Sequence, residues 1–564
     1  MNSTRQHDLA YLQENSNPTV LIIGGGVNGI GTFRDLALQG VDVLLVEKND
    51  FASGASAASS HMAHGGIRYL ENGEFRLVRE AVRERNRMIQ NAAHYVKPLP
   101  TTIPIFKWWS GIFNAPLKFL RLLDKPSERG AVIIKMGLIM YDAYTGANRT
   151  VPRHKLTFRK QALAKYPKLN PEILCTASYY DGAIIQPERL CVEMILDTET
   201  DCPHAKAINY MEASGAEDDT VVLKDALTGE TYTVKPKIVI NAAGPWIDFA
   251  NQALGKQTKF IGGTKGSHLI LDHPELRTAI GESEFFFENK DGRIVLIYPL
   301  MDKVMIGTSD LYIENPDDAR CTDEEIGYFF EMLDKVFPSI KVDRSQIVFQ
   351  FSGVRPLPAS DAKRAGQVSR DHSIRETESG NGLHFPIFSL VGGKWTSFRA
   401  FSEQVADKIL SQLERPRLQT THNLGIGGGR DYPHETEGVE DWIAFVEKKT
   451  GLSAERVRQL FDHYGTRAAE IAGFISVSED HPLEHHPAFS VRELTYLAQS
   501  EKVVHIDDFL LRRSLVAMLG EVTRPLVEEL ADVFGDALGW DETQKAAEIA
   551  HTVEILHERN GVTL

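Results

Sequence analysis

The sequence predicts an α/β protein with a Rossmann-type nucleotide-binding domain, an interleaved α+β domain and a C-terminal all-α domain. Three observations predict this fold class. A strand, a glycine loop, a helix and a second strand follow one another over residues 19–46. A further strand, glycine pair and helix appear much later, over residues 386–413, which indicates a late return to the same sheet. From about residue 434 to the end, apolar residues recur at helical spacing.

Composition supports a globular protein and excludes several classes. The chain has 564 residues, of which 42% are hydrophobic and 25% charged, so it is too apolar for an intrinsically disordered protein. Its 62 Lys and Arg against 77 Asp and Glu give a formal net charge of −15, which argues against nucleic acid as a partner. The four cysteines are dispersed and form no CxxC pair, so neither a disulfide framework nor a metal site is expected. This pattern fits a cytoplasmic protein.

Changes in composition along the chain predict its domain organisation. Residues 1–18 are polar, and 414–433 are rich in Pro, Gly, Arg and Thr, as in a linker. Helices are expected over 490–500, 506–520, 524–538 and 541–558, the last with a capping box at Asp541 and Gln544. The predicted units are a polar tail (1–18), a discontinuous nucleotide-binding domain (19–90, 180–255, 386–413), a discontinuous substrate-binding domain (91–179, 256–385), the linker (414–433) and a helical domain (434–564).

The glycine loop between the first strand and helix has the spacing of a dinucleotide-binding fingerprint. Gly24 makes the turn, Gly26 lets the backbone approach a pyrophosphate, and Gly29 lets the helix pack on the strand. Glu47 ends the next strand, where an acidic side chain bonds ribose hydroxyls and disfavours NADP. A purely structural glycine turn is the alternative, and the combined strand, helix and acid argue against it.

Two later segments favour FAD over NAD. The strand at 237–240 runs into Asn-Ala-Ala-Gly-Pro-Trp (241–246), whose small residues let backbone pass close to a flat ring. A helix also begins at the Gly-Gly-Lys of 392–394, and its N-terminus stabilises negative charge on a reduced flavin. Each segment alone is equally compatible with an ordinary strand–turn–helix.

Together these segments carry a family resemblance. The motifs are 24–29 with EKNDFASG (47–54), Ser59-Ser60, HGGIRYL (64–70), FRLVREA (75–81), NAAGPW (241–246), KGSH (265–268), GTSD (307–310), SGVRPL (352–357) and GGK (392–394). Over about residues 19–410 the chain resembles the FAD-dependent glycerol-3-phosphate dehydrogenases, and the helical tail fits the family's C-terminal cap. The resemblance implies a glutathione-reductase-like FAD-binding domain. It implies that the cofactor-binding residues are Gly24, Gly26, Asn28, Gly29, Glu47, Lys48, Ser53, Ser59, Ser60, Gly65, Gly66, Ala243, Gly244, Trp246, Gly393, Lys394 and Trp395.

The implied reaction oxidises sn-glycerol 3-phosphate to dihydroxyacetone phosphate, with hydride transfer to flavin N5. It needs a base for the hydroxyl proton, and histidine suits that role at neutral pH. His268 is the favoured proton acceptor and His64 is placed near substrate or flavin, although the reverse assignment also fits.

Cations are needed to hold the phosphate dianion of this substrate. The expected substrate-binding residues are Arg68, Tyr69, Arg355, Arg370 and Lys394, and Arg355 is also counted as catalytic. Tyr69 would add a hydrogen bond. The alternative role of Arg355 is an ion pair that supports its own strand.

The segment 105–121 predicts where the enzyme meets its electron acceptor. Two tryptophans and three phenylalanines alternate there with three cations, as in a segment lying in a bilayer interface. A core helix or a homodimer contact is the alternative. No apolar stretch is long enough to span a membrane. A quinone-reducing member of the family needs access to the membrane, so the resemblance and this segment together imply a peripheral protein on the inner face of the cytoplasmic membrane that passes electrons to quinone.

Three other functions remain open from the sequence. An oxidase of the same fold would pass electrons to O₂, and a relative could act on another polyol phosphate, such as a tetritol phosphate. A flavin-binding sensor or structural protein would keep the glycine loop without the chemistry, but it would have no need for His64, His268, Arg68, Arg355 and Lys394 together.

Overall fold

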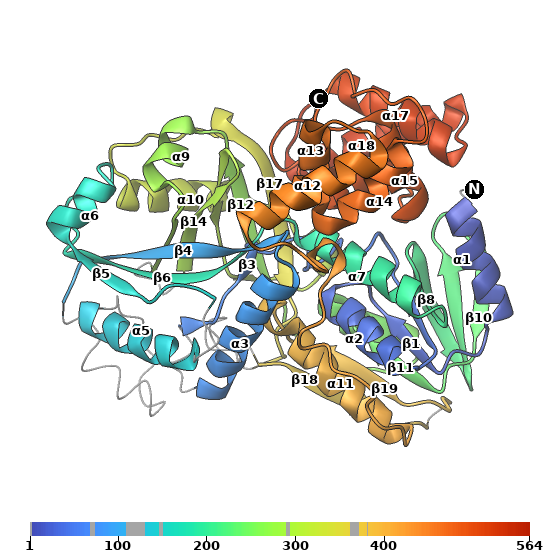
Figure 1. Ribbon diagram of the computed structural model, residues 1–564. Helices are drawn as coiled ribbons and strands as arrows, with labels where there is room; N and C mark the ends of the chain where they lie inside the picture. Colours follow the sequence, from blue (N-terminus) through green and yellow to red (C-terminus); the bar gives the residue numbers. More distant parts are fainter. Residues whose placement is uncertain are drawn as a thin grey trace.

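The computed structural model describes residues 3–67, 74–108, 130–145, 150–288, 294–360, 371–380 and 382–564. Within them lie a parallel-sheet domain, a domain built around a ten-stranded sheet, and a helical C-terminal domain (Figure 1). The predicted fold class is therefore confirmed. No helix among the described residues is long and apolar enough to cross a membrane.

The first domain is a six-stranded sheet in the order β18-β19-β11-β1-β2-β7. The five strands from β19 to β7 are parallel to one another, and the edge strand β18 is antiparallel to β19. The strands are β1 (Val20–Ile23), β2 (Val43–Val46), β7 (Ala205–Ile208), β11 (Ile238–Asn241), β18 (Ser373–Thr377) and β19 (Ile387–Val391). The early βαβ unit and the late strand thus share one sheet, as their apolar runs predict.

Helices cover this sheet, and a small antiparallel sheet adjoins it. The helical elements are α2 (Val27–Leu38), α7 (Pro187–Asp201), η2 (Gly244–Trp246), α8 (Ile247–Ala253), η6 (Trp395–Ser397) and α11 (Phe398–Gln412). The small sheet consists of β8 (Met211–Glu217), β9 (Thr220–Asp225) and β10 (Thr231–Val234). Helices α2 and α11 pack closely, since a Cβ at Gly31 would lie 2.5 Å from the Ser402 hydroxyl.

The second domain is built around a ten-stranded sheet. Its strands are β3 (Met62–Ala63), β4 (Val96–Ile105), β5 (Lys155–Phe158), β6 (Cys175–Ile184), β12 (Thr264–Leu271), β13 (Glu284–Glu288), β14 (Ile294–Leu300), β15 (Lys303–Gly307), β16 (Leu311–Tyr312) and β17 (Ile347–Arg355). The associated helical elements are α3 (Phe75–Asn91), α5 (Ala131–Thr145), α6 (Arg159–Lys165), α9 (Pro274–Ile280), η3 (Pro316–Asp318), α10 (Asp323–Val336) and η4 (Arg344–Gln346).

Strand periodicity sorts the side chains of β12 between two cores. Leu269 and Leu271 pack with α9 and α10, whereas Ile270 packs with the C-terminal helices. Because alternate residues of a strand face opposite sides, His268 shares the face of Ile270. On the neighbouring β17, Phe351 and Arg355 share a face for the same reason. The register of β12 and β17 places His268 opposite Phe351.

The C-terminal domain is helical, as predicted, and its core merges with the facing side of the ten-stranded sheet. It contains α12 (Thr436–Thr450), α13 (Ala454–Tyr464), η8 (Gly465–Arg467), α14 (Ala468–Ile475), α15 (Val491–Ser500), α16 (Ile506–Asp508), η9 (Phe509–Arg513), α17 (Arg524–Leu538) and α18 (Glu542–Asn560). The capping box at Asp541 and the C-cap at Gly561 are both present.

The prediction of a single helix over residues 506–520 is wrong. One turn of α-helix (α16) passes into the π-helical turn η9, and Ser514 is extended with φ −143° and ψ 175°. The Ser514 hydroxyl donates to the Phe509 carbonyl at 3.0 Å, which satisfies a carbonyl at the helix end. Apolar periodicity continues through this break, so the sequence pattern does not reveal it.

The segments predicted as a polar tail and as a linker both contain packed structure. The predicted polar tail contains α1 (Ser3–Glu14), which buries Leu9 and Leu12 and pairs Arg5 with Asp225 at 3.0 Å. The predicted linker contains the buried turn η7 (Gly427–Gly429), whose first amide donates to Asp197 at 2.7 Å. Buried polar groups thus fix both segments to the parallel-sheet domain.

Candidate active site

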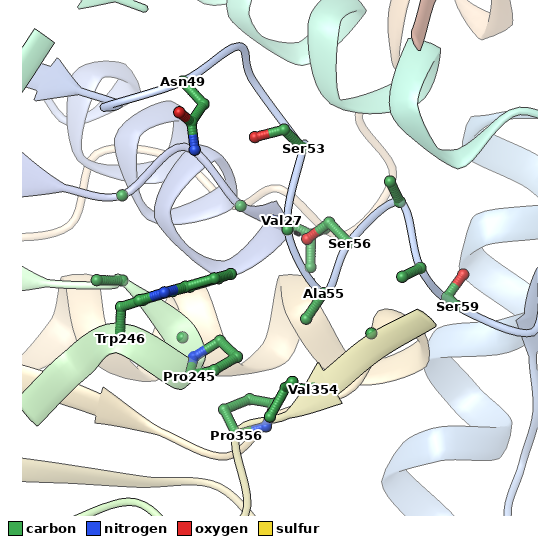
Figure 2. A pocket seen from close by; sticks show the side chains of 18 of the residues that line it. Val27, Asn49, Ser53, Ala55, Ser56, Ser59, Pro245, Trp246, Val354 and Pro356 are labelled. Carbon is green, nitrogen blue, oxygen red and sulfur yellow. Dashed lines mark hydrogen bonds between the residues drawn. The ribbon is translucent and has the colours of Figure 1, made fainter. Parts of the chain in front are cut away.

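A cavity of about 680 Å³ is lined by residues from all three domains. Figure 2 shows residues 53–59 on one side of this cavity, with Pro245, Trp246, Val354 and Pro356 facing them. Residues 53–59 follow β2, and Pro245 and Trp246 lie in η2. Val354 lies at the end of β17, and Pro356 lies just beyond it. The cavity therefore runs from the parallel sheet to the face of the ten-stranded sheet that carries His268.

The parallel-sheet end of the cavity fits a dinucleotide. Gly24 has φ +113°, and a Cβ there would lie 2.6 Å from the Ala242 carbonyl oxygen. A Cβ on Gly29 would lie 2.0 Å from the Gly24 carbonyl oxygen, so only glycine lets α2 start this close to the strand. The amide end of α2 faces the cavity at Val27 and Asn28. It provides the partial positive charge that binds a pyrophosphate.

Glu47 is held in place by backbone amides. Its two carboxylate oxygens accept from Gly25 at 2.7 Å and Asn49 at 2.9 Å. Burial raises the pKa of Glu47 above its ordinary value, against the effect of these two hydrogen bonds. Each oxygen retains a second acceptor position, so the side chain fits the expected contact with a ribose.

The later glycine segment closes over the same cavity. The Asn28 side chain donates to the Gly392 carbonyl at 3.2 Å, and the Trp395 indole donates to the Ser56 carbonyl at 2.9 Å. Ser56 in turn accepts from the Val27 amide at 2.9 Å. The residues around the glycine pair are therefore tied to the first glycine loop, although more than 350 residues separate them in the chain.

His268 lies at the other end, deeply buried on β12. Its Nε2 is 2.8 Å from the Ser60 hydroxyl, and its ring stacks on Phe351 with centroids 4.8 Å apart. Burial, followed by the positive charge of Arg355 and the nearby His61, lowers the pKa of His268 well below its ordinary value. The imidazole is therefore neutral at pH 7, which is the state required of a general base.

Arg355 ends β17 and its guanidinium is fixed by a polar turn. It donates to the Thr308 hydroxyl at 2.8 Å and the Ser309 carbonyl at 3.2 Å, and it lies 3.3 Å from Asp310. A Cβ on Gly266 would lie 2.3 Å from this guanidinium. The ion pair proposed as an alternative role therefore exists, and the same side chain also lines the cavity.

The structure brings most of the predicted site residues to this one cavity. His64, which accepts at its carbonyl from Thr396 at 3.0 Å, lines it together with Arg355 and Lys394. The predicted cofactor-binding residues that also line it are Gly24, Gly26, Asn28, Glu47, Lys48, Ser53, Ser59, Ser60, Ala243, Gly244, Trp246, Gly393 and Trp395.

Three of the predicted cofactor-binding glycines lie outside the cavity lining, and three predicted substrate-binding residues lie outside the described part of the chain. Gly29, Gly65 and Gly66 do not line the cavity. Gly29 packs helix on strand, and the Gly65 amide donates to Tyr141 and Asp181, each at 3.0 Å. Arg68, Tyr69 and Arg370, and the segment 109–121 of the expected membrane-binding stretch, lie outside the described residues.

Sequence reasoning missed several residues around the site. Phe351 stacks on His268, and the ring of fully buried His61 lies 6.4 Å from that of Phe351, centroid to centroid. Burial lowers the pKa of His61 to about 4. The C-terminal domain also contributes to the cavity wall; its lining residues include His505, Arg512, His551 and Arg559. Phe351 precedes the SGVRPL motif by one residue, but no local signal marks the C-terminal residues.

Among the described residues, no cluster of three or more His, Cys, Asp or Glu side chains is arranged to hold a metal ion. Four cysteines occur, and each is a free thiol. Burial raises the pKa of Cys191 well above its ordinary value and that of Cys321 to about 12.

Comparison with known proteins agrees with this geometry. Residues 19–395 match the model of the FAD dependent oxidoreductase family, and 419–545 match the C-terminal domain of alpha-glycerophosphate oxidase. The glycerol-3-phosphate dehydrogenase of Synechocystis sp. is 32% identical over 94% of this chain and 95% of its own length. The aerobic glycerol-3-phosphate dehydrogenase of Staphylococcus haemolyticus is 30% identical over 92% and 91%, respectively.

Solved structures share the fold. The glycerol-3-phosphate dehydrogenase from Bacillus halodurans, complexed with FAD, superimposes with a TM-score of 0.74 at 24% identity, over 99% of this chain and 98% of that one. The L-alpha-glycerophosphate oxidase from Mycoplasma pneumoniae, with FAD bound, superimposes with a TM-score of 0.51 at 18% identity, over 70% of this chain and 95% of that one. The chain belongs to the family of FAD-dependent glycerol-3-phosphate dehydrogenases and oxidases, and FAD is its cofactor.

Proposed function

We propose that this protein oxidises sn-glycerol 3-phosphate to dihydroxyacetone phosphate with FAD and passes the electrons to a quinone. The observation that carries the proposal is the composition of one cavity. Its glycine-loop end fits a dinucleotide, its other end holds neutral, buried His268 with the positive charge of Arg355 nearby, and Lys394 also lines the cavity. The printed names of the relatives support glycerol 3-phosphate as the substrate.

The chain's own residues have distinct proposed roles. Arg355 and Lys394, with Arg68, Tyr69 and Arg370, hold the phosphate, and His268 accepts the hydroxyl proton. The Ser60 hydroxyl orients the His268 ring through its 2.8 Å contact with Nε2, and His64 lines the same cavity. Bound FAD would supply the oxidising chemistry, as the acceptor of the hydride that leaves the alcohol carbon.

Anaerobic titration of the FAD-loaded protein tests this proposal. Oxidised flavin absorbs at about 450 nm, and we expect glycerol 3-phosphate to bleach this absorbance. Glycerol at the same concentration should bleach it far more slowly, because it has no phosphate for the cations to bind. Unchanged absorbance with glycerol 3-phosphate, but bleaching with a tetritol phosphate, would instead assign the protein to that substrate. No bleaching with any polyol phosphate would support a non-catalytic flavoprotein.

An oxidase that uses O₂ is the second candidate. It is favoured by the match of residues 419–545 to the C-terminal domain of alpha-glycerophosphate oxidase. The substrate-reduced protein should be exposed both to air and, anaerobically, to a soluble quinone. Rapid recovery of absorbance in air with stoichiometric hydrogen peroxide assigns an oxidase, whereas recovery with the quinone alone assigns the dehydrogenase.

An exposed apolar surface supports a membrane location for quinone reduction. Its exposed side chains are Phe106 and Trp108 just after β4, Met136 and Ile139 on α5, and Phe158 at the end of β5, and the start of α5 adjoins the chain after β4 through the hydrogen bond from the Ala131 amide to the Lys107 carbonyl at 3.0 Å. Met136, Ile139 and Phe158 are each more than half exposed, and Trp108 contacts Phe158 with ring centroids 6.3 Å apart. Clustered apolar side chains of this kind bind a bilayer interface.

Flotation with lipid vesicles tests the membrane location. Ile139→Glu should reduce the vesicle-bound fraction, because a carboxylate does not enter the apolar interface. Val477→Glu is the control, since Val477 is 74% exposed in the C-terminal domain, away from this surface. Unchanged flotation together with conversion of a dimer to monomers by Ile139→Glu would make the surface a homodimer contact.

A further inference from the structure

The wall of the FAD cavity is not confined to the nucleotide-binding domain. Residues of α16, η9, α18 and the turn after η9 line it as well, among them His505, Arg512, Met518, His551 and Ile555. These residues lie between positions 505 and 560, outside the segment that matches the FAD dependent oxidoreductase model.

Of these residues, His505, its ring neighbour His551 and Arg512 lie at the ribose end of the cavity. Glu47 marks that end, because it occupies the ribose-binding position after β2. The Glu47 carbonyl accepts from the Met211 amide at 2.7 Å, and the Asn49 carbonyl accepts from the Tyr210 amide at 3.0 Å. The Tyr210 ring packs edge-on against His505 with centroids 5.0 Å apart, and its hydroxyl donates to Asp508 at 2.6 Å.

A buried charge cluster joins the two domains at this place. Asp50, three residues beyond Glu47, is 1% exposed and accepts from Arg512 at 2.6 Å and from both terminal nitrogens of Arg513. Burial alone would raise the pKa of Asp50, but the two guanidinium groups hold it below its ordinary value. Asn209 adds a hydrogen bond to Asp50 at 3.0 Å and donates to the Lys502 carbonyl at 2.9 Å.

The two arginines of this cluster are consecutive residues of the π-helical turn η9. In η9 both side chains reach Asp50, and the chain then leaves the helix at Ser514. Departures from regular helix of this kind occur most often where a function requires them.

We propose that the C-terminal helical domain closes the adenosine end of the FAD cavity, and that the contact of Asp50 with Arg512 and Arg513 holds it closed. The domain thereby sets how slowly FAD leaves the protein. This inference rests on FAD as the cofactor and is independent of the substrate and of the electron acceptor.

The test measures FAD release from the holoprotein, with neither glycerol 3-phosphate nor acceptor present. Free FAD is followed by its fluorescence after dilution, for wild type, Ile555→Ala, Ile549→Ala and Arg512→Met. Ile555 and Ile549 both lie on α18 and are both half-buried, but only Ile555 lines the cavity. Unfolding of each apoprotein and the flavin absorption spectrum of each holoprotein are recorded alongside.

We expect Ile555→Ala to release FAD roughly fivefold faster than wild type, through loss of its buried apolar contact. Arg512→Met should accelerate release roughly tenfold or more, because it breaks a buried charge cluster. Ile549→Ala should release FAD at the wild-type rate, with all flavin spectra unchanged, since the isoalloxazine end is untouched.

Three results would overturn the proposal. The first is release at the wild-type rate by Ile555→Ala, and the second is equal acceleration by Ile549→Ala. The third is a shifted flavin spectrum in Ile555→Ala, which would locate the effect at the ring end. If Arg512→Met fails to fold, the comparison of the two isoleucine variants still decides.

Discussion

At the scale of single residues, burial and charge determine the protonation state of His268. Its pKa is lowered well below the ordinary value by burial, and the positive charge of Arg355 lowers it further. An unfolded histidine titrates near pH 6.5, so the folded protein keeps His268 neutral where a free histidine begins to be protonated. Activity should therefore hold from pH 7 down to below pH 6.5, and the rate of flavin reduction across that range measures this.

Replacing His268 should slow the chemistry far more than it weakens binding. We expect His268→Asn to lower the rate of flavin reduction by roughly 10²- to 10⁴-fold, the usual contribution of a general base, with little change in substrate affinity. Stopped-flow reduction at varied substrate concentration separates the two effects. His273→Asn is the control, because His273 is a buried histidine that caps α9 and asparagine also caps helices. An unchanged reduction rate in His268→Asn would assign the proton to another residue, with His64 the next to test.

Arg355 should contribute mainly to recognition of the phosphate. Arg355→Met removes a charge-assisted hydrogen-bond donor, which is worth roughly 1.5–3 kcal/mol, or about 10- to 100-fold in substrate affinity. The variant should also lose preference for glycerol 3-phosphate over glycerol, as measured by flavin bleaching with each. Equal losses toward the two compounds would show that Arg355 acts through its Thr308 and Asp310 contacts on the fold.

At the scale of elements, the close packing of α2 on the glycine loop shapes the end of the cavity that fits the dinucleotide. A Cβ on Gly29 would lie 2.0 Å from the Gly24 carbonyl oxygen and 3.2 Å from the Ala242 Cβ. Gly327 in α10 offers a matched comparison, because nothing lies within 4 Å of a Cβ built there.

We expect Gly29→Ala to lose bound FAD and to unfold at lower temperature, since the backbone must shift. Gly327→Ala should keep FAD and gain up to roughly 1 kcal/mol of stability, because alanine favours helix over glycine. Flavin content after purification and thermal unfolding check both variants. Full FAD content in Gly29→Ala would mean that the loop tolerates more distance than its geometry indicates.

At the scale of the whole molecule, the C-terminal domain depends on buried charge pairs, and one of them is sensitive to pH. His505 lies 2.9 Å from Glu548. Burial would lower its pKa, but the hydrogen bond to Glu548 and the charges of Asp508 and Asp507 raise it to about 9. Since the unfolded value is near 6.5, this histidine stabilises the fold fully below pH 6.5, and the stabilisation is lost as pH rises through about 9.

His505→Gln should therefore lower the free energy of unfolding by roughly 1–2 kcal/mol at pH 6, with the difference vanishing above about pH 9. Urea unfolding of both proteins from pH 6 to 10 measures this. A difference that is constant across the range would show that packing against Tyr210 and His551, rather than charge, is what the histidine contributes.

The sequence predicts those parts of the fold and site that depend on local pattern. The first βαβ unit, the late strand at 387–391 and the capping box at Asp541 follow from periodicity, glycine spacing and cap chemistry. The break at Ser514 and the burial of α1 depend on Asp50 and Asp225, which are distant in sequence. The same reason explains why the stacking of Phe351 on His268 and the C-terminal wall of the cavity were not predicted.

A crystal structure of the FAD-loaded protein with dihydroxyacetone phosphate tests the central claim most directly. The phosphate should lie on Arg355 and Lys394, with the carbonyl oxygen within hydrogen-bond distance of His268 and the flavin ring between these groups and the glycine loop. A product molecule bound outside the cavity, or bound with its phosphate directed away from both cations, would contradict the account.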